Sequence, residues 1–254
     1  MQGGDALLSH VPELRHPSRR LMAASIAALM FALASAAMIA VDIFLPAWAL
    51  AGQVVVILAG FGVAGQFFWR RKEYRAKWGE RAYRNAFLRH MLPGLPMMFA
   101  AIFHTAYMPG ERVPLGWATP IAAMLGLYFA ATGFVLWARA GEYFGADNGG
   151  MLYVYFPDES RMIESAIYGI LRHPMYSGAV RVGLALGLWR GTFFSILFGL
   201  FMPIGLTLWL RLAEEPELIE RFGEAYAEHR RNVPAFWPRA AQWGKFWRFL
   251  ISGR

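Results

Sequence analysis

The hydrophobic positions of this chain gather into long uninterrupted runs. Residues 21–41 form a run of 21 residues without a charged side chain, and residues 44–69 carry only Gln53 and Gln66 as strongly polar side chains. A helix of about 20 residues spans about 30 Å, which is the thickness of the hydrocarbon core of a bilayer. The two runs therefore predict two membrane spans joined by a tight turn at Pro46.

Later runs extend this pattern to about six membrane segments. Residues 91–108 and 115–138 predict a third and a fourth span, and residues 177–212, broken at 189–191, predict a helical hairpin whose first arm is short. The segment 69–90 holds eight Lys or Arg side chains against two Glu, so the positive-inside rule predicts that it is a cytoplasmic loop. With six segments, both termini lie in the cytoplasm.

The remaining segments are more polar. Residues 1–20 predict a cytosolic tail, and residues 139–174 form the longest polar stretch between spans, a length that is typical of functional loops. After Glu214, apolar residues recur at helical spacing as far as Tyr226, which predicts an amphipathic helix. Tryptophan, phenylalanine, lysine and arginine mix over residues 236–249, which predicts an interfacial segment on the cytoplasmic leaflet.

Composition agrees with a bilayer as the solvent. Hydrophobic residues make up 57% of the chain, and the mean hydropathy is +0.35, more than a soluble core needs. The absence of cysteine excludes disulfides, thiolate metal sites and cysteine nucleophiles. The net charge is +8, and the basic residues lie beside the apolar spans, which favours lipid headgroups over nucleic acid as partners. We expect an all-α polytopic protein of a cell inner membrane or an endoplasmic-reticulum-type membrane.

The segment Arg172–Gly178 carries the first candidate chemistry. Proline suits the first turn of a helix, so we expect a helix to begin at about Pro174 with His173 near its N-cap. The free N–H groups of such a terminus bind anions, and the carboxylate of an amino-acid-like cofactor fits them. His173 and Tyr176 share a helix face. In the alternative interpretation, Arg172 meets lipid phosphate and Tyr176 belongs to an interfacial aromatic belt.

Carboxylates after the hairpin form a second candidate group. Glu214 and Glu215 suit the ribose hydroxyls or the ammonium group of a ligand, or they simply cap the acidic helix. Because a hairpin returns the chain to the membrane face that it left, we expect Glu214 to lie close to His173, 41 residues earlier. Arg181, about one turn inside the hairpin, must snorkel, pair or face a cavity. Glu142, just below the fourth span, is a candidate for the same site or a membrane-edge residue.

Metal ligands are not expected, because the lone histidines have no partners at metal-ligand spacing; these are His10, His16, His90 and His104.

The joint pattern resembles the integral-membrane methyltransferase superfamily of isoprenylcysteine carboxyl methyltransferases and phospholipid N-methyltransferases, which use S-adenosylmethionine. It covers roughly residues 138–238, and its parts are Tyr168, Arg172-His173-Pro174-x-Tyr176-x-Gly178, Glu214-Glu215-x-x-Leu218, Phe222-Gly223-x-x-Tyr226 and Val233-Pro234-x-Phe236-x-Pro238. The chain departs from the pattern at Ala166-Ile167, His229 and Ala235. The segments Gly141–Gly145 and Glu214-Glu215-Pro216 are similar to the phosphatidylethanolamine-methylating branch, whereas the Arg-His pair is often missing there.

The resemblance implies a cofactor site and a division of the chain. The implied cofactor-binding residues are Tyr168, Arg172, His173, Tyr176, Gly178, Glu214, Glu215, Val233 and Pro234, with the Val233-Pro234 segment closing over the cofactor. Residues 115–254 then form the methyltransferase core with a cytoplasmic active site. Residues 1–114 contribute the tail, three spans and the basic loop.

The implied reaction is methylation of a membrane lipid by S-adenosylmethionine. A phospholipid amine headgroup is favoured over a carboxyl or thiol group of an isoprenylated or small hydrophobic acceptor. In-line displacement at a sulfonium carbon needs no protein nucleophile. An amine acceptor must first lose a proton, for which Glu142 or Glu215 is the candidate base. A carboxylate acceptor needs no base, and Arg181 or Arg172 would orient it.

Two alternatives belong to other classes. A sterol-reductase-type NADPH enzyme carries a similar His-Pro-x-Tyr hairpin. A small transporter or lipid-binding scaffold would use Arg181 and the glutamines of the second span as pathway residues.

Overall fold

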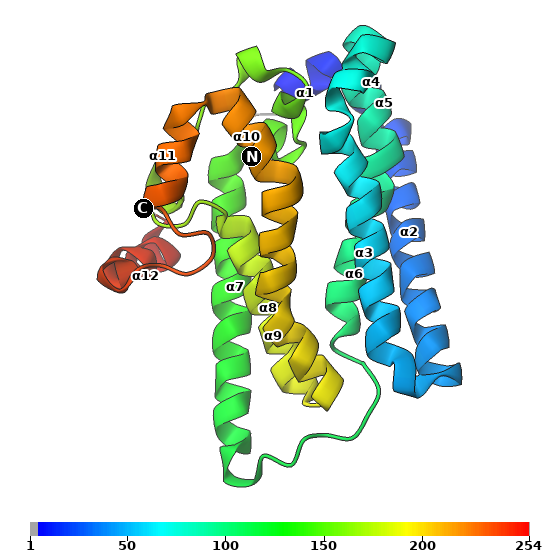
Figure 1. Cartoon of the computed structure of the whole chain (residues 1–254), viewed down its shortest axis with the longest axis vertical. Coiled ribbons are helices and arrows are strands. Elements are labelled where there is room, and N and C mark those ends of the chain that lie inside the picture. Colours follow the sequence, from blue (N-terminus) through cyan, green and yellow to red (C-terminus); the bar gives the residue numbers. More distant parts are fainter. Residues whose placement is uncertain (1–4, 254) are drawn as a thin grey trace. The chain divides into compact units, whose positions relative to one another are not determined.

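The structure is a computed structural model that describes residues 5–253, and helices supply its regular structure (Figure 1). Among these residues, strand-like pairing is limited to an isolated bridge between Arg112 and Thr192. The described residues form two compact units. The N-terminal unit comprises residues 5–114 and 190–198, and the C-terminal unit comprises 115–189 and 199–253. Residues 1–4 of the predicted cytosolic tail lie outside the described residues.

The helices follow one another with short connections. The α-helices are α1 (Asp5–His10), α2 (Pro17–Phe44), α3 (Ala49–Trp69), α4 (Arg71–Trp78), α5 (Ala82–Ala86), α6 (Leu92–His104), α7 (Thr119–Gly149), α8 (Pro174–Arg190), α9 (Phe193–Trp209), α10 (Glu215–Phe222), α11 (Glu224–Asn232) and α12 (Trp243–Ser252). Short 3-10 segments are Pro12–Arg15, Pro46–Trp48, Gly79–Arg81, Gly116–Ala118, Leu152–Val154, Pro157–Glu159, Ala166–Gly169 and Ala240–Gln242. Two π-helical segments are Phe87–Met91 and Leu210–Glu214.

Within residues 5–253, five helical stretches are long and apolar enough to cross a membrane. They are Pro17–Phe44, Pro46–Trp69, Arg71–His104, Gly116–Gly149 and Phe193–Phe222. They correspond to the four predicted spans and the second arm of the predicted hairpin, although the third span ends at His104 and not at residue 108. Helix α8, with 17 residues, is the short first arm. The chain is therefore an all-α polytopic membrane protein, as the sequence predicts.

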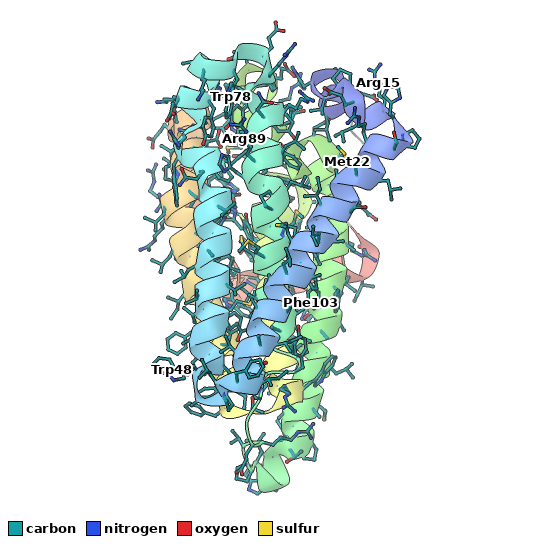
Figure 2. All side chains as sticks on the ribbon, turned by 90° about the vertical axis from the view of Figure 1, so that its right-hand side faces the viewer. Arg15, Met22, Trp48, Trp78, Arg89 and Phe103 are labelled. Carbon is teal, nitrogen blue, oxygen red and sulfur yellow. The ribbon has the colours of Figure 1, made fainter. Side chains whose placement is uncertain are left out.

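In the N-terminal unit, α6 packs against both α2 and α3 (Figure 2). A Cβ atom on Gly94 would lie 2.8 Å from the backbone nitrogen of Ala64, so a glycine is needed where α6 crosses α3. Small residues allow such close crossings between membrane helices, where packing replaces the hydrophobic effect. Phe103 of α6 contacts Phe31 of α2, with 6.4 Å between their ring centroids.

Polar side chains of these spans bind one another inside the unit. Nε2 of His104 lies 2.7 Å from Oδ2 of Asp42, and the His104 side chain is fully buried. Nε2 of Gln53 donates a hydrogen bond to Oγ1 of Thr105 at 3.0 Å. These pairs reduce the cost of placing polar groups between apolar helices.

The prediction that residues 69–90 form a loop is wrong, because this segment is helical in α4, α5 and the turns around them. Its lysine, arginine, glutamate and alanine residues are good helix formers, and the high charge density concealed that propensity. The ring of Trp78 stacks on Tyr74 with 4.5 Å between centroids, and the guanidinium carbon of Arg89 lies 4.7 Å from the Trp78 ring (Figure 2). Gly79, with a φ of 52°, ends α4.

In the C-terminal unit, the structure differs from two predictions, and a glycine with a positive φ lies at each place. Helix α7 continues well into the predicted polar stretch 139–174 and bends at Gly145, which has a φ of 74°. The predicted amphipathic helix after Glu214 is divided into α10 and α11 by Gly223, whose φ of 60° few other residues adopt.

The predicted interfacial segment near the C-terminus contains the helix α12. Phe246 and Phe249 are buried against a cluster that includes Leu136 of α7. The guanidinium of Arg139 donates to the carbonyl oxygens of Phe249 at 3.1 Å and Ile251 at 3.0 Å. An arginine at a helix C-terminus binds carbonyl groups that have no partner in the helix itself. Arg139 therefore fastens α12 to α7.

Candidate functional site

The candidate site forms around the start of α8. The helix begins at Pro174, which confirms the prediction. The helical hydrogen bonds begin when the N–H of Ser177 donates to the carbonyl oxygen of His173 at 2.9 Å. Proline has no N–H. The backbone N–H groups of the first turn that have no partner within the helix are therefore those of Met175 and Tyr176.

Residues 233–236 lie directly against this helix start. The N–H of Arg172 donates to the carbonyl oxygen of Pro234 at 3.0 Å, and the N–H of His173 donates to that of Ala235 at 3.3 Å. One turn later, Oγ of Ser177 donates to the carbonyl oxygen of Phe236 at 2.6 Å. Three hydrogen bonds thus hold the backbone of residues 233–236, called the closing segment below, against the start of α8.

The returning hairpin brings both carboxylates to the same place. Nδ1 of His173 lies 3.7 Å from Oε1 of Glu214, and its Nε2 lies 3.4 Å from Oε1 of Glu215. The predicted proximity of His173 and Glu214 is therefore confirmed. The π-helical segment Leu210–Glu214 leads into α10 at this point, and such segments often occur at functional sites.

Glu215 is almost completely buried and fully engaged. Its Oε1 accepts from Nε of Arg172 at 2.9 Å, and its Oε2 lies 3.1 Å from Nε of Arg230. The terminal Nη1 of Arg172 also donates to the carbonyl oxygen of Val233 at 2.7 Å. Arg172 therefore joins the start of α8, the carboxylate of α10 and the closing segment.

Glu214 has a different environment. Its Oε2 accepts a 2.6 Å hydrogen bond from the Tyr176 hydroxyl, which itself accepts from Nε1 of Trp209 at 3.2 Å. The Glu214 side chain keeps 16% of its surface exposed, against 1% for Glu215. Of the two carboxylates, Glu214 is the one that a ligand can reach.

Helix α11 adds two side chains. The Tyr226 hydroxyl lies 3.3 Å from Nε2 of His173. Burial, assisted by Glu215 and Glu214, raises the pKa of Tyr226. The phenol therefore stays neutral near pH 7. Burial also lowers the pKa of His229, which keeps that imidazole neutral at the same pH.

Four predicted residues lie outside this cluster of contacts. Tyr168 is buried in the core, stacks on Phe144 and donates to the carbonyl oxygen of Ala140 at 3.4 Å. A Cβ on Gly178 would lie 2.9 Å from the carbonyl oxygen of Gly133, so Gly178 serves the crossing of α7 and α8. The third, Arg181, is buried further along α8. The fourth, Glu142, is exposed on α7. Their roles toward a cofactor or an acceptor stay predictions.

The sequence assigned no role to three members of the cluster. Tyr226 lies in the Phe222-Gly223-x-x-Tyr226 pattern, which was the signal that pointed to it. Trp209 and Arg230 had no such signal, because each acquires its role only when the hairpin and α11 fold back.

The cluster combines groups of opposite charge with neutral hydrogen-bonding groups. Two carboxylates, two guanidinium groups, an imidazole and two phenols gather where the start of α8, the junction of the π-helical segment with α10, and α11 meet. Among the described residues, no three His, Asp or Glu side chains are placed to hold a metal ion. The arrangement suits a small zwitterionic ligand that carries both an anionic and a cationic group.

Comparison with known proteins finds a family that is similar to this region. Residues 121–225 match the family model for phospholipid methyltransferase. No curated protein and no solved structure matches the chain. The matched segment contains α8, the π-helical segment, both carboxylates and the start of α11. The match covers less than half of the chain, and it shows that this part is similar to the phospholipid methyltransferase family. It supports a methyltransferase of the integral-membrane superfamily.

Proposed function

We propose that this enzyme transfers a methyl group from S-adenosylmethionine to the amine headgroup of a membrane phospholipid, and that the cluster around His173 binds the cofactor. The 3.7 Å approach of His173 to Glu214 carries the proposal, because it joins two family motifs that are 41 residues apart in the sequence. The family match supports the reaction class.

The residues present fit the charges of this cofactor. Its amino-acid part carries a carboxylate, which suits the N–H groups of Met175 and Tyr176 at the positive end of α8. Its ammonium group or ribose hydroxyls suit the accessible carboxylate of Glu214. S-adenosylmethionine supplies an electrophilic methyl group on its sulfonium, so the protein has to bind and orient the reactants and exclude water.

The two carboxylates have separate roles in this proposal. Because each oxygen of Glu215 is engaged by an arginine, this carboxylate is a poor base for an amine acceptor. We therefore assign Glu215 to positioning Arg172 and His173, and Glu214 to contact with the cofactor. The closing segment, held to α8 by Arg172, shields the bound cofactor from water.

We place the cluster and both termini at the cytoplasmic face. The positive-inside rule assigns the basic segment 69–90 to the cytoplasm. From there the third and fourth spans lead out and back, so the chain enters α8 from the cytoplasmic side. This topology gives a soluble cofactor access from the cytosol. The host membrane is then an inner membrane or an endoplasmic-reticulum-type membrane.

Calorimetric binding of S-adenosylhomocysteine to the purified protein in nanodiscs tests the cofactor site. Glu214→Gln removes the charge and keeps the shape, and it should weaken binding about tenfold or more. Glu224→Gln is the matched control, because Glu224 is an exposed glutamate paired with Arg231 on α11. The assignment fails if the wild type does not bind or if both variants bind equally well.

Lipid mass spectrometry tests the acceptor. Cells that express the protein should accumulate phosphatidylethanolamine species heavier by one or more methylene masses, and cells that express the Glu214→Gln variant should not. Methylated isoprenyl or small hydrophobic products in place of these lipids would contradict the phospholipid assignment.

A further inference from the structure

Arg181 is a buried cation inside the apolar hairpin. It follows Pro174 by seven residues, which is roughly 10 Å along α8, and its side chain is fully buried. A charge at such a position is costly, and in membrane proteins it usually pairs with an opposite charge or serves a ligand.

Aromatic rings hold the guanidinium in place. Its central carbon lies 4.4 Å from the ring centroid of Trp237 and 5.1 Å from that of Phe246. Cation–π contacts of this kind favour arginine and leave its hydrogen-bonding edge available. Trp237 lies in the chain that follows the closing segment, and Phe246 belongs to α12.

Of the three guanidinium nitrogens of Arg181, only Nε has a hydrogen-bond partner. Nε of Arg181 donates to Oγ of Ser177 at 3.4 Å. Both terminal nitrogens are buried without a hydrogen-bond partner, and no carboxylate among the described residues satisfies them. Tyr128 is a further polar neighbour that interacts with the guanidinium, and both terminal nitrogens still lack a hydrogen-bond partner. Two parallel donors are therefore available at the end of the side chain.

We propose that Arg181 binds the anionic group of the methyl acceptor, with two oxygens of a phosphodiester or a carboxylate facing its two terminal nitrogens. Parallel donors on a planar fork match such an oxyanion in a bidentate way that a lysine ammonium does not reproduce. The rings of Trp237 and Phe246 provide an apolar surface for the adjoining part of a lipid.

The location supports a role for the acceptor and not for the cofactor. Ser177 links the two regions, because its N–H binds His173 and its hydroxyl contacts both the closing segment and Arg181. The cluster proposed for the cofactor thus occupies the start of α8, and Arg181 lies about two turns further along this apolar helix. This inference rests on the proposed methyl transfer and adds the group of the acceptor that the enzyme recognises.

Binding of a short-chain phosphatidylethanolamine in detergent, measured by calorimetry, tests the proposal. Arg181→Met removes the charge at similar length and should weaken lipid binding at least tenfold, while S-adenosylhomocysteine binding stays at the wild-type value. Arg181→Lys keeps the charge without the fork and should bind the lipid at least threefold more weakly than the wild type. Arg211→Met, at an exposed arginine beyond α9, is the control and should bind as the wild type does.

Initial rates with three acceptors identify the source of the anion. The acceptors are a phosphatidylethanolamine, a long-chain fatty acid and a long-chain primary amine without an anionic group. Arg181→Met should raise KM selectively for the phosphodiester or for the carboxylate, and leave the rate with the plain amine unchanged. Lipid affinity at the wild-type value in Arg181→Met, or equal loss of lipid and S-adenosylhomocysteine binding, would overturn the proposal. Failure of the wild type to bind S-adenosylhomocysteine would instead contradict the cofactor site.

Discussion

Glu215→Gln provides the sharpest test of how the cluster is held together. The glutamate is almost completely buried and contacts Arg172 at 2.9 Å and Arg230 at 3.1 Å. Removing one partner of a buried ion pair costs about 3–5 kcal/mol, because the other charge is left uncompensated. Arg230 is 37% exposed, so water screens its contribution, and the glutamine oxygen can still accept one hydrogen bond from Arg172.

We therefore expect a loss near the lower end of that range, about 3 kcal/mol. For a chain of this size, that loss corresponds to a fall in Tm of about 6–12 °C. Tryptophan fluorescence during heating in nanodiscs measures Tm, with Glu224→Gln as the control because its ion pair with Arg231 is exposed to solvent. Equal Tm values for the wild type and both variants would refute the view that Glu215 holds α8 and α10 together.

Three further predictions concern other parts of the fold. Gly178→Ala should lower Tm, because the added methyl group would lie 2.9 Å from a backbone oxygen, whereas Gly205→Ala, with open space around it, should not; the opposite order would exclude the proposed helix crossing. Burial, assisted by Glu214, raises the pKa of Tyr168 above 10.0, so the folded protein keeps a proton that the unfolded chain releases. The contribution of Tyr168 to the free energy of unfolding is complete below pH 10 and falls as the pH rises further, by about 1.4 kcal/mol per pH unit. Tyr168→Phe should therefore reduce the slope of Tm against pH above pH 10, and an unchanged slope would count against this explanation. His104→Ala leaves Asp42 without its 2.7 Å partner and should lower Tm more than Asp42→Asn, which can still accept from His104; equal Tm values would contradict the pairing.

The membrane segments and the approach of Glu214 to His173 could be predicted from the sequence because they depend on the long apolar runs and their order. A run of about 20 apolar residues has few alternatives to a membrane helix. The break at 189–191 required the chain to return, so the approach of Glu214 to His173 followed from topology without any knowledge of packing.

Local backbone geometry was harder to predict. Segment 69–90 was interpreted by its charge, although its residues favour a helix and its aromatic and basic side chains stack on one another. The break at Gly223 depends on a positive φ, which a glycine permits but does not require. The π-helical segment before Glu215 has no sequence signal of its own.

Partners of the site residues were the least predictable feature. Arg172 was expected to contact lipid or a cofactor, yet it binds Glu215 and the carbonyl oxygens of residues 230 and 233. These acceptors belong to segments that come together only in the folded chain. The motifs therefore predicted which residues gather, but the structure was needed to separate the fully paired Glu215 from the more exposed Glu214.

In the proposed function, the different environments of Glu214 and Glu215 explain why the chain has two adjacent glutamates, although one carboxylate would be enough to neutralise a cationic ligand. Glu215 is saturated by arginines, and its burial makes it a fixed part of the protein. Glu214 has one oxygen on Tyr176 and a loose approach to His173, so it can exchange these contacts for those of a ligand at a small cost. If a single glutamate served both purposes, binding a cationic ligand would release Arg172 and with it the closing segment. In the proposed function, separate carboxylates would allow the cofactor to bind and leave while Arg172 and residues 233–236 stay in place.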